Sequence, residues 1–517
     1  MIICTKHLLY LFIFVSLVTY GQTSKLATIT LKDGKISGTK NQKGYIHMFK
    51  GIPFAAPPVG NLRWKEPQPV IPWKGIRKCD TFSASAMQTK PVPFMMYTQE
   101  FLAPAEPLNE DCLYLNVWTP AKSGNEKLPV IVWIHGGAFV SGSGSVPIYD
   151  GEEIAGKGVV FVTINYRLGV LGFLAHPELT KESAHQVSGN YGLLDQIAAL
   201  RWVKENIAGF GGNPNLVTIA GQSAGAFSVN ALMASPLAKG LFHRVIAESG
   251  GMFNGNTAGQ KLEDGEKNGL ELAQKMGTAS IAELRARSAE ELIKAGGMFR
   301  PVIDNYVLPA IYTTFAAGKQ NDVPVLTGWN AGDGFASPNP LSATAYREDA
   351  EKKYGRKTTD FLKAYPGNTD EEAKQSQFEL ARDQVFGWQN YTWASLQSKS
   401  GKNKTFLYYF SQVPPNKADG ISYGAFHSAE ISYALHTLHK WDRPWRESDR
   451  KLEDVMSSYW VNFAATGDPN GKGLPIWPAF TTDSKQVMEL SDTGKVRELP
   501  SRTQFEFWDM YQTSLQR

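Results

Sequence analysis

The stretch Leu216–Gly225, which reads LVTIAGQSAG, decides the fold. Its first half is a short apolar run with β-branched residues, which predicts a buried strand. Its second half is a GxSxG pentapeptide, and a helix-like stretch rich in Ala, Met and Leu follows it to Ala234. A serine on a sharp turn between a strand and a helix projects its hydroxyl above the sheet, and the flanking glycines permit the cramped backbone. We therefore predict that Ser223 is a nucleophile; the alternative is a tight structural turn with an idle serine.

Other apolar runs alternate with helical patterns along the chain. Residues 195–207 repeat their apolar positions at helical spacing, whereas the flanking runs have the short, β-branched character of buried strands. Strands separated by helices predict a mostly parallel α/β sheet, and ligands bind beyond the carboxyl ends of its strands. The chain shows no linker or repeat, so we expect one domain over residues 22–517. The main predicted strands are 128–134, 158–166, 216–220, 243–248, 323–326 and 405–413.

Residues 1–21 have the pattern of a secretory signal peptide. Lys6 precedes an apolar stretch from Leu8 to Val18, and the small residue Gly21 stands just before Gln22. Such a segment is too short and too poorly flanked for a membrane span. No later run reaches the ~18 consecutive apolar residues of a spanning helix. We expect a mature chain that is secreted or periplasmic and has no membrane span.

The composition points to a large folded core without a strong charge bias. Hydrophobic residues make up 42% of the 517 residues, and the formal net charge is +4. A charge this small does not favour nucleic acid or a membrane surface as a partner. We therefore expect no nucleic acid partner.

The cysteines indicate a disulfide. Cys4 belongs to the predicted signal peptide, which leaves Cys79 and Cys112 as an even pair in an exported chain. We predict that they are bridged, and such a bridge would contribute about 3–4 kcal/mol to stability. Two free buried thiols are the alternative.

A serine nucleophile needs a base that takes its proton, and the base needs an acid that orients it. With this kind of turn the histidine follows the acid in the chain, which leaves His243, His427, His436 and His439. His243 begins a predicted strand close behind the nucleophile helix. His436 and His439 lie in a helix-like stretch without further metal ligands, which favours a surface position. His427 lies in a glycine-containing loop before an apolar helix and is the best base; a helix cap is the alternative.

Three aspartates compete as the acid. Asp333 lies in a loop that follows a short predicted strand, as an acid at the carboxyl edge of the sheet should. Asp322 precedes that strand and therefore lies at the wrong edge. Asp304 lies in a segment that reads as a turn. We favour Asp333, against the alternative that it is an ordinary residue of an Asp-Gly turn.

An acyl-transfer site also needs amide donors where negative charge develops on the carbonyl oxygen. The glycine-rich loop 135–139, HGGAF, and the residue after the nucleophile, Ala224, are suitable sources. A plain turn and a phosphate cradle are the alternatives for the loop, but no Gly-Lys-Ser/Thr sequence follows it. We expect no metal ion and no organic cofactor.

Segments spread over nearly the whole mature chain match one family pattern. They are Phe49–Trp64, Glu110–Trp118, His135–Phe139, Asn165–Phe173, Gly189–Gln196, Gly211–Gly225, Ala247–Gly250, Gly424–Ile431 and Asn462–Asn470. With these segments the chain resembles the type-B carboxylesterases, the family of cholinesterases, liver carboxylesterases and bacterial p-nitrobenzyl esterases. The resemblance implies the α/β-hydrolase fold, a mostly parallel sheet flanked by helices, with helical insertions that form the pocket.

The resemblance also implies roles for individual residues. It makes Ser223 the nucleophile, Asp333 the acid and His427 the base, in agreement with the elimination above. It implies oxyanion donors on the amides of Gly137, Ala138 and Ala224, and a disulfide between Cys79 and Cys112. The implied reaction is hydrolysis of a small-molecule or polymer-borne carboxylic ester through an acyl-enzyme. A non-catalytic recognition or adhesion module on the same fold is the alternative function.

The chain departs from the family pattern at several positions. Gln222 stands where the family often has Glu, a position to which we assign no catalytic role. Asp333 stands where the family usually has Glu, so a shorter carboxylate must reach the same imidazole. No tryptophan lies between Cys79 and Cys112, where cholinesterases use one to hold a quaternary ammonium, so a choline ester is not the expected substrate. We expect the pocket walls to come from insertions that include residues 80–110 and 252–300.

Overall fold

The computed structural model describes residues 28–253, 259–335, 337–417, 420–492 and 494–515. The predicted signal peptide, residues 1–21, lies outside the described residues. No helix in these ranges is long and apolar enough to cross a membrane.

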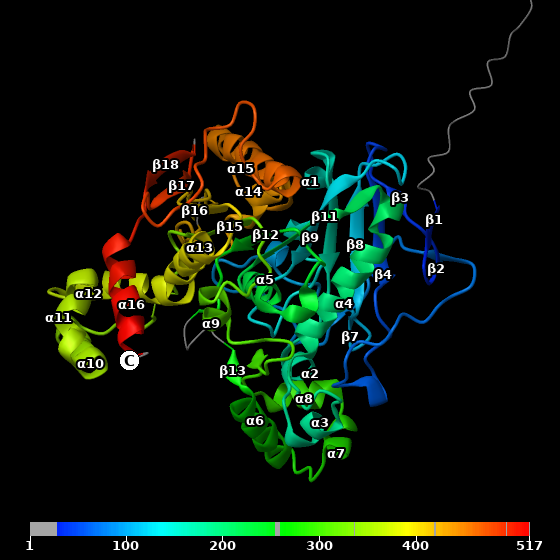
Figure 1. The fold of residues 1–517 in the computed structure, drawn as a ribbon, viewed down its shortest axis with the longest axis horizontal. Coiled ribbons are helices and arrows are strands. Elements are labelled where there is room, and N and C mark those ends of the chain that lie inside the picture. Colours follow the sequence, from blue (N-terminus) through cyan, green and yellow to red (C-terminus); the bar gives the residue numbers. More distant parts are fainter. Residues whose placement is uncertain (1–27, 254–258, 336, 418–419, 493, 516–517) are drawn as a thin grey trace, which may run out of the picture.

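One large sheet of 11 strands forms the centre of the fold (Figure 1). All neighbouring pairs from β17 to β10 are parallel, and the remaining pairs at both edges are antiparallel. This order confirms the predicted mostly parallel sheet. In spatial order the strands are β18 (Lys495–Glu498), β17 (Gln486–Leu490), β16 (Thr405–Phe410), β15 (Val325–Asn330), β12 (Arg244–Glu248), β11 (Gly212–Gln222), β9 (Leu128–Ile134), β10 (Val160–Ile164), β8 (Tyr114–Thr119), β4 (His47–Pro53) and β3 (Thr39–Lys40).

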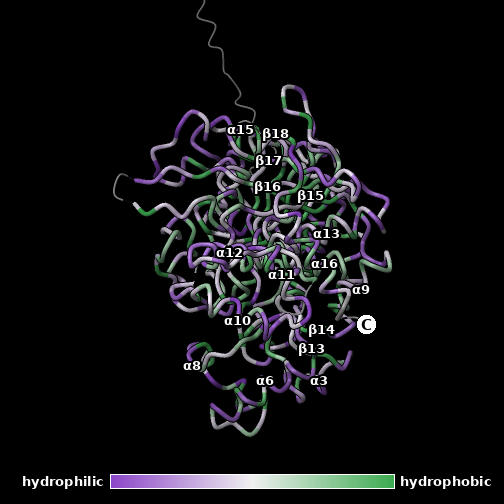
Figure 2. The backbone as a smooth tube through the Cα atoms, turned by 90° about the vertical axis from the view of Figure 1, so that its left-hand side faces the viewer, coloured by the Kyte–Doolittle hydropathy of each residue, from purple (hydrophilic) through white to green (hydrophobic). Residues whose placement is uncertain are grey.

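Helices cover both faces of this sheet, because alternate residues of its central strands pack into two different cores. In β9, Val130 and Val132 belong to the core that includes residues of α4 (Tyr191–Asn206) and α5 (Ala224–Ala234). Ile131 and Trp133 belong to the core that includes residues of α15 (Glu447–Thr466). A strand buried on both faces reads as a continuous apolar run, which is the pattern that predicted it. Figure 2 shows the hydrophobic segments gathered inside the molecule.

Helices α10 (Ala343–Tyr354), α11 (Thr358–Ala364), α12 (Asp370–Arg382) and α16 (Arg502–Leu515) form a group beyond one edge of the sheet (Figure 1, left). The aromatic rings of Tyr354, Phe361 and Phe507 pack against one another within this group. The chain leaves α12 through a π-helical turn, Asp383–Gly387, and continues into α13 (Trp388–Ser400), which packs on β15 and β16. This turn brings Val385 and Phe386 to the carboxyl edge of the sheet, near Ser223 and His427.

Element boundaries differ from the predictions where a local feature overrides the apolar pattern. The strand predicted at 323–326 begins at Val325, because Pro324 has no amide hydrogen for the ladder, and it continues to Asn330. The helix predicted at 195–207 begins at Tyr191. The helix-like stretch 433–440 is broken into the short α14 (Ile431–Ala434) and a 3₁₀ turn, with His436 in a left-handed conformation between them.

The predicted disulfide between Cys79 and Cys112 is wrong, since both thiols are free and buried. Cys79 follows β5 (Ile76–Lys78), where its amide donates to the Ser37 carbonyl at 2.7 Å and its carbonyl accepts from Lys50. Cys112 instead lines a small cavity together with Met87. Both thiols belong to the same buried apolar cluster, in which they remain unbridged. Burial raises the pKa of Cys79 to about 11 and raises the pKa of Cys112 further, so both thiols stay protonated at neutral pH.

Candidate active site

Ser223 lies on the predicted turn between β11 and α5. Its backbone has φ 57° and ψ −124°, a conformation that costs about 1–3 kcal/mol for a residue other than glycine. Two contacts hold the turn: the Ser223 amide donates to the Glu248 carbonyl at 2.9 Å, and the Phe227 amide donates to the Ser223 carbonyl at 2.9 Å. Gly225 is required by close approach, because a Cβ there would overlap the carbonyl oxygen of Ile134. The serine side chain is half-buried and faces a cavity.

Asp333 and His427 are in direct contact. The Asp333 Oδ1 lies 2.8 Å from the imidazole Nδ1, and both side chains are almost fully buried. The second carboxylate oxygen accepts from the Ser249 hydroxyl at 2.8 Å and from the Asn330 amide at 2.7 Å. A carboxylate on Nδ1 holds the proton at that nitrogen and leaves Nε2 as an acceptor. The shorter aspartate therefore reaches the imidazole, as the sequence required.

Ser223 and His427 line the same cavity, but no hydrogen bond joins their side chains. The side-chain nitrogen of Gln222 lies 3.2 Å from the imidazole Nε2 and 3.3 Å from Nδ1. An in-line hydrogen bond to one ring nitrogen would leave that amide much farther from the other, so Gln222 is not aligned with the Nε2 lone pair. Hydrogen bonds of this kind often form only when substrate is bound.

The loop after β9 presents free amides to the same cavity. Gly137, Ala138 and Phe139 have positive φ angles of 104°, 54° and 63°. The Gly137 carbonyl accepts from the amides of Val140 and Ser141, and Phe139 anchors the loop by packing on Phe173. Within the described part of the chain, the amides of Gly137, Ala138 and Ala224 donate to no other group. Adjacent unpaired amides of this kind form a nest that can bind an anion.

The cavity that these residues share has a volume of about 430 Å³. Its walls include segment 88–103, as predicted, but no described residue of 252–300. Other parts of the wall come from the π-helical turn, with Val385 and Phe386, and from the acid loop, with Phe335. Among the described residues that line the cavity, none is Asp, Glu, Lys or Arg. The site therefore suits an uncharged group of moderate size.

Of the other candidate histidines, His243 and His436 lie in structural contacts, and His439 is exposed on the 3₁₀ turn Leu438–Lys440. The Val217 amide donates to the imidazole of His243 at 3.3 Å, at the start of the strands rather than their carboxyl ends. His436 pairs with Asp454 at 2.9 Å on the outside of α15. The described residues contain no group of three or more side chains that could hold a metal ion.

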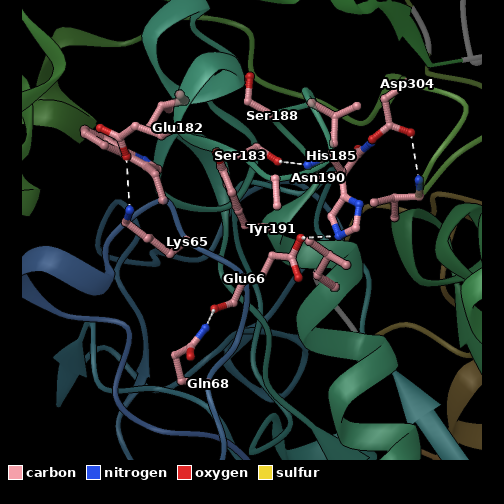
Figure 3. A pocket seen from close by; sticks show the side chains of 16 residues that line it. Lys65, Glu66, Gln68, Glu182, Ser183, His185, Ser188, Asn190, Tyr191 and Asp304 are labelled. Carbon is pink, nitrogen blue, oxygen red and sulfur yellow. Dashed lines mark hydrogen bonds and ion pairs between the residues drawn. The ribbon is translucent and has the colours of Figure 1, made fainter.

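The other candidate acids are also placed away from His427. Asp322 accepts from the side chain of Gln397 at 2.7 Å and from the Lys402 amide at 2.9 Å, before β15 begins. Asp304 lines a second cavity of about 220 Å³, which shares no lining residue with the first (Figure 3). Its carboxylate accepts from Asn190 at 2.8 Å and from the amides of the turn that follows it.

The sequence analysis missed several residues that surround His427. Gln222 contacts the ring, Ser249 contacts the acid, and Phe386 stacks on the imidazole with 4.3 Å between the ring centroids. Ser249 belongs to the family segment Ala247–Gly250, whose side chains have no role in the predicted site. Phe386 comes from the π-helical turn, and no sequence pattern predicted that this turn contacts the histidine.

Two buried glutamates lie behind the acid and the base. Glu248 ends β12 and accepts from the indole nitrogen of Trp460 at 2.8 Å, and Glu430 accepts from the side chain of Asn330. Burial raises the pKa of Glu248 to about 8. Burial, with the charges of Glu248 and Asp333, raises the pKa of Glu430 well above its usual value. Both glutamates are therefore protonated at neutral pH, which avoids further negative charge beside the Asp333 carboxylate.

This protonation predicts a pH-dependent stability. Folded Glu248 keeps a proton up to a pKa of about 8, whereas the unfolded chain releases it near 4.5. The stability that this group contributes is complete below pH 4.5 and is lost as pH rises through 8. Between pH 5 and pH 8, the free energy of unfolding measured in urea should fall by a few kcal/mol less in Glu248→Gln than in the wild type, because the variant has no carboxyl group at this position to release a proton. Parallel curves for the two proteins would contradict the prediction.

Comparisons with known proteins agree with this geometry. The sequence model of the Carboxylesterase family matches residues 25–508. The chain is 38% identical over 476 residues to a fumonisin B1 esterase of Sphingopyxis macrogoltabida, covering 87% of this chain and 84% of that protein. It is 34% identical over 505 residues to the para-nitrobenzyl esterase of Bacillus subtilis (strain 168), covering 91% and 96%. A solved structure of a thermophilic PNB esterase superimposes with a TM-score of 0.81 at 31% identity, covering 93% of this chain and 99% of the other.

The fold and the comparisons together define an α/β hydrolase. The chain belongs to the carboxylesterase family, as its resemblance implied. It is a carboxylic-ester hydrolase of type B, which disfavours the alternative of a non-catalytic adhesion module.

Proposed function

We propose that this protein hydrolyses esters through an acyl-enzyme formed on Ser223. His427 accepts the serine proton at Nε2 while the hydroxyl oxygen attacks the ester carbonyl, and Asp333 stabilises the imidazolium that results. The amides of Gly137, Ala138 and Ala224 receive the negative charge on the carbonyl oxygen. His427 then protonates the leaving alcohol, and a water molecule repeats the sequence on the acyl-enzyme.

One observation carries this proposal: His427, whose Nδ1 lies 2.8 Å from the Asp333 carboxylate, lines the same cavity as a strained serine and unpaired amides. Each unpaired amide directed at the developing charge would lower the barrier by about 3–4 kcal/mol. The proposal requires that the Ser223–His427 hydrogen bond forms on substrate binding, through rotation of the serine side chain or a shift of the ring. Removal of Gln222 from the ring on substrate entry would assist it.

The substrate that fits the cavity is an ester of an uncharged acid and alcohol. Cavity walls without Asp, Glu, Lys or Arg side chains would leave a charged group desolvated and unpaired, at a cost of several kcal/mol. One relative is named for p-nitrobenzyl esters, and esters of aromatic alcohols suit the aromatic walls of Phe94, Phe335 and Phe386. A nucleic acid partner has no support from the charge of the chain.

Partitioning of the acyl group tests the mechanism. Phenyl and p-nitrophenyl esters of one acid should give the same ratio of methyl ester to free acid when methanol is added, because both pass through one acyl-enzyme. A ratio that depends on the leaving group, or the absence of methyl ester with both substrates, would contradict an acyl-enzyme. The test holds even when deacylation is fast, since it needs no accumulation of the intermediate.

We further propose that residues 1–21 direct export and are removed, so that the mature protein is secreted or periplasmic. The support is the charge, apolar core and small exit residue of this segment. Mass spectrometry of the protein from its own cells should show an N-terminus at Gln22. An intact N-terminus on protein from the cytoplasmic fraction would refute export.

A further inference from the structure

Apolar side chains surround the opening of the catalytic cavity and remain exposed there. Phe94, Val140 and Phe335 line the cavity, yet they are 54%, 48% and 48% exposed. Val92 and Met95, their neighbours in the chain, are 65% and 57% exposed. These five residues, here called the apolar rim, come from the insertion, the oxyanion loop and the acid loop. Exposed apolar clusters beside a cavity are typical of binding sites.

The turn from Phe94 to Tyr97, which carries two of the five rim residues, is strained and anchored to the catalytic histidine. Phe94 and Tyr97 exchange backbone hydrogen bonds of 3.1 and 2.9 Å, which leaves Met95 at the tip with a φ of 47°. The Tyr97 hydroxyl donates to the His427 carbonyl at 3.3 Å, and the Met96 side chain is buried. The turn thus holds the exposed Met95 in a conformation that costs free energy, while the buried Met96 and the Tyr97 hydroxyl anchor it. Such strain at an exposed apolar tip is characteristic of functional sites.

The apolar rim continues the apolar lining of the cavity, and one of its residues contacts the catalytic histidine. The Phe335 ring lies 5.9 Å from the imidazole of His427 in an edge-to-face arrangement, so the rim begins at the catalytic residues themselves. Two charges on the insertion, Lys90 and Glu106, are paired with each other at 3.6 Å, and Glu100 is half-buried and does not line the cavity. A chain leaving the cavity would therefore meet apolar surface without a charged side chain among the described lining residues.

We propose that the apolar rim is a substrate subsite, which binds the uncharged hydrocarbon part of an ester that extends out of the cavity when its carbonyl lies at Ser223. This inference rests on the proposed function of Ser223. It assigns to this protein esters with a long aliphatic chain or a bulky apolar group. Each methylene that lies on the rim should raise kcat/KM by about twofold, since an open surface covers only part of the group.

A series of p-nitrophenyl esters from acetate to decanoate, assayed below their micellar concentrations, tests the subsite. In the wild type, kcat/KM should rise with chain length up to the longest soluble ester. The double variant Phe94→Ser/Met95→Ser should lower the decanoate-to-acetate ratio of kcat/KM by about tenfold. Both residues are exposed, so the variant should fold. Ile476→Ser is the matched control, because Ile476 is 80% exposed and does not line the cavity.

An unchanged decanoate-to-acetate ratio in the double variant overturns the subsite. So does a variant that keeps the ratio but loses binding to phosphatidylcholine vesicles, because the rim would then dock on a lipid surface. A wild-type dimer that the same substitutions convert to a monomer, again with an unchanged ratio, would assign the rim to a second copy of the chain. Failure of the proposed function is distinct, since acetate would then be hydrolysed equally by Ser223→Ala.

Discussion

Ser223→Ala is expected to lower kcat for a p-nitrophenyl ester by about 10⁴-fold or more without unfolding the protein. The substitution removes the only atom that we propose to bond to the acyl group. The amides of the oxyanion loop and the cavity walls remain, so binding and a small residual rate should persist. Alanine is smaller than serine and fits the turn, although the positive φ of residue 223 stays unfavourable.

Measurements of kcat and KM test this prediction, and the midpoint of thermal unfolding of each protein checks that it is folded. Ser484→Ala is a suitable control, because Ser484 is an exposed serine that does not line the cavity. It should match the wild type in every parameter. A rate within tenfold of the wild type for Ser223→Ala would mean that another nucleophile, or a water activated directly, performs the reaction.

Asp333→Asn should have the second-largest effect, a loss of about 10⁴-fold in kcat. Asparagine can keep an oxygen toward the Ser249 hydroxyl and the Asn330 amide, so the loop geometry should survive. Its side-chain NH₂ would then face Nδ1 of His427 and force the proton onto Nε2, which could no longer accept from Ser223. The imidazolium would also lose its counter-charge.

Asp322→Asn is the matched comparison for the acid, because Asp322 competed with Asp333 in the sequence and also accepts two hydrogen bonds. It should cost about 1 kcal/mol of stability and leave kcat unchanged. His427→Ala should lower kcat about as much as Ser223→Ala does. Near-normal rates in His427→Ala, or equal effects of Asp333→Asn and Asp322→Asn, would move the base or the acid elsewhere.

The parts of the fold that sequence predicts are those that local patterns determine. β9 lies at the predicted residues, because Leu128–Ile134 is apolar throughout and a strand buried on both faces needs that composition. The turn at Ser223 follows from glycines that no other residue could replace beside Ile134. The Asp333–His427 contact was predictable from chain order, from the position of Asp333 after a strand, and from the position of His427 in a glycine-containing loop before an apolar helix.

The remaining features depend on contacts between distant segments. Phe386 reaches His427 only because a π-helical turn redirects the chain after α12, and single-sequence periodicity does not register such a turn. Gln222 received no role because its neighbour in space, His427, is 205 residues away in the chain. The disulfide prediction failed because an even cysteine count does not report how two thiols lie relative to each other in the folded chain.

Labelling with a fluorophosphonate, followed by intact mass and peptide mapping, tests the proposed serine chemistry most directly. The account predicts uptake of one equivalent at Ser223, loss of esterase activity in proportion, and a rate of labelling that falls sharply in His427→Ala and Asp333→Asn. An active protein that takes up no label, or that carries the label on another residue while Ser223 stays free, would contradict it.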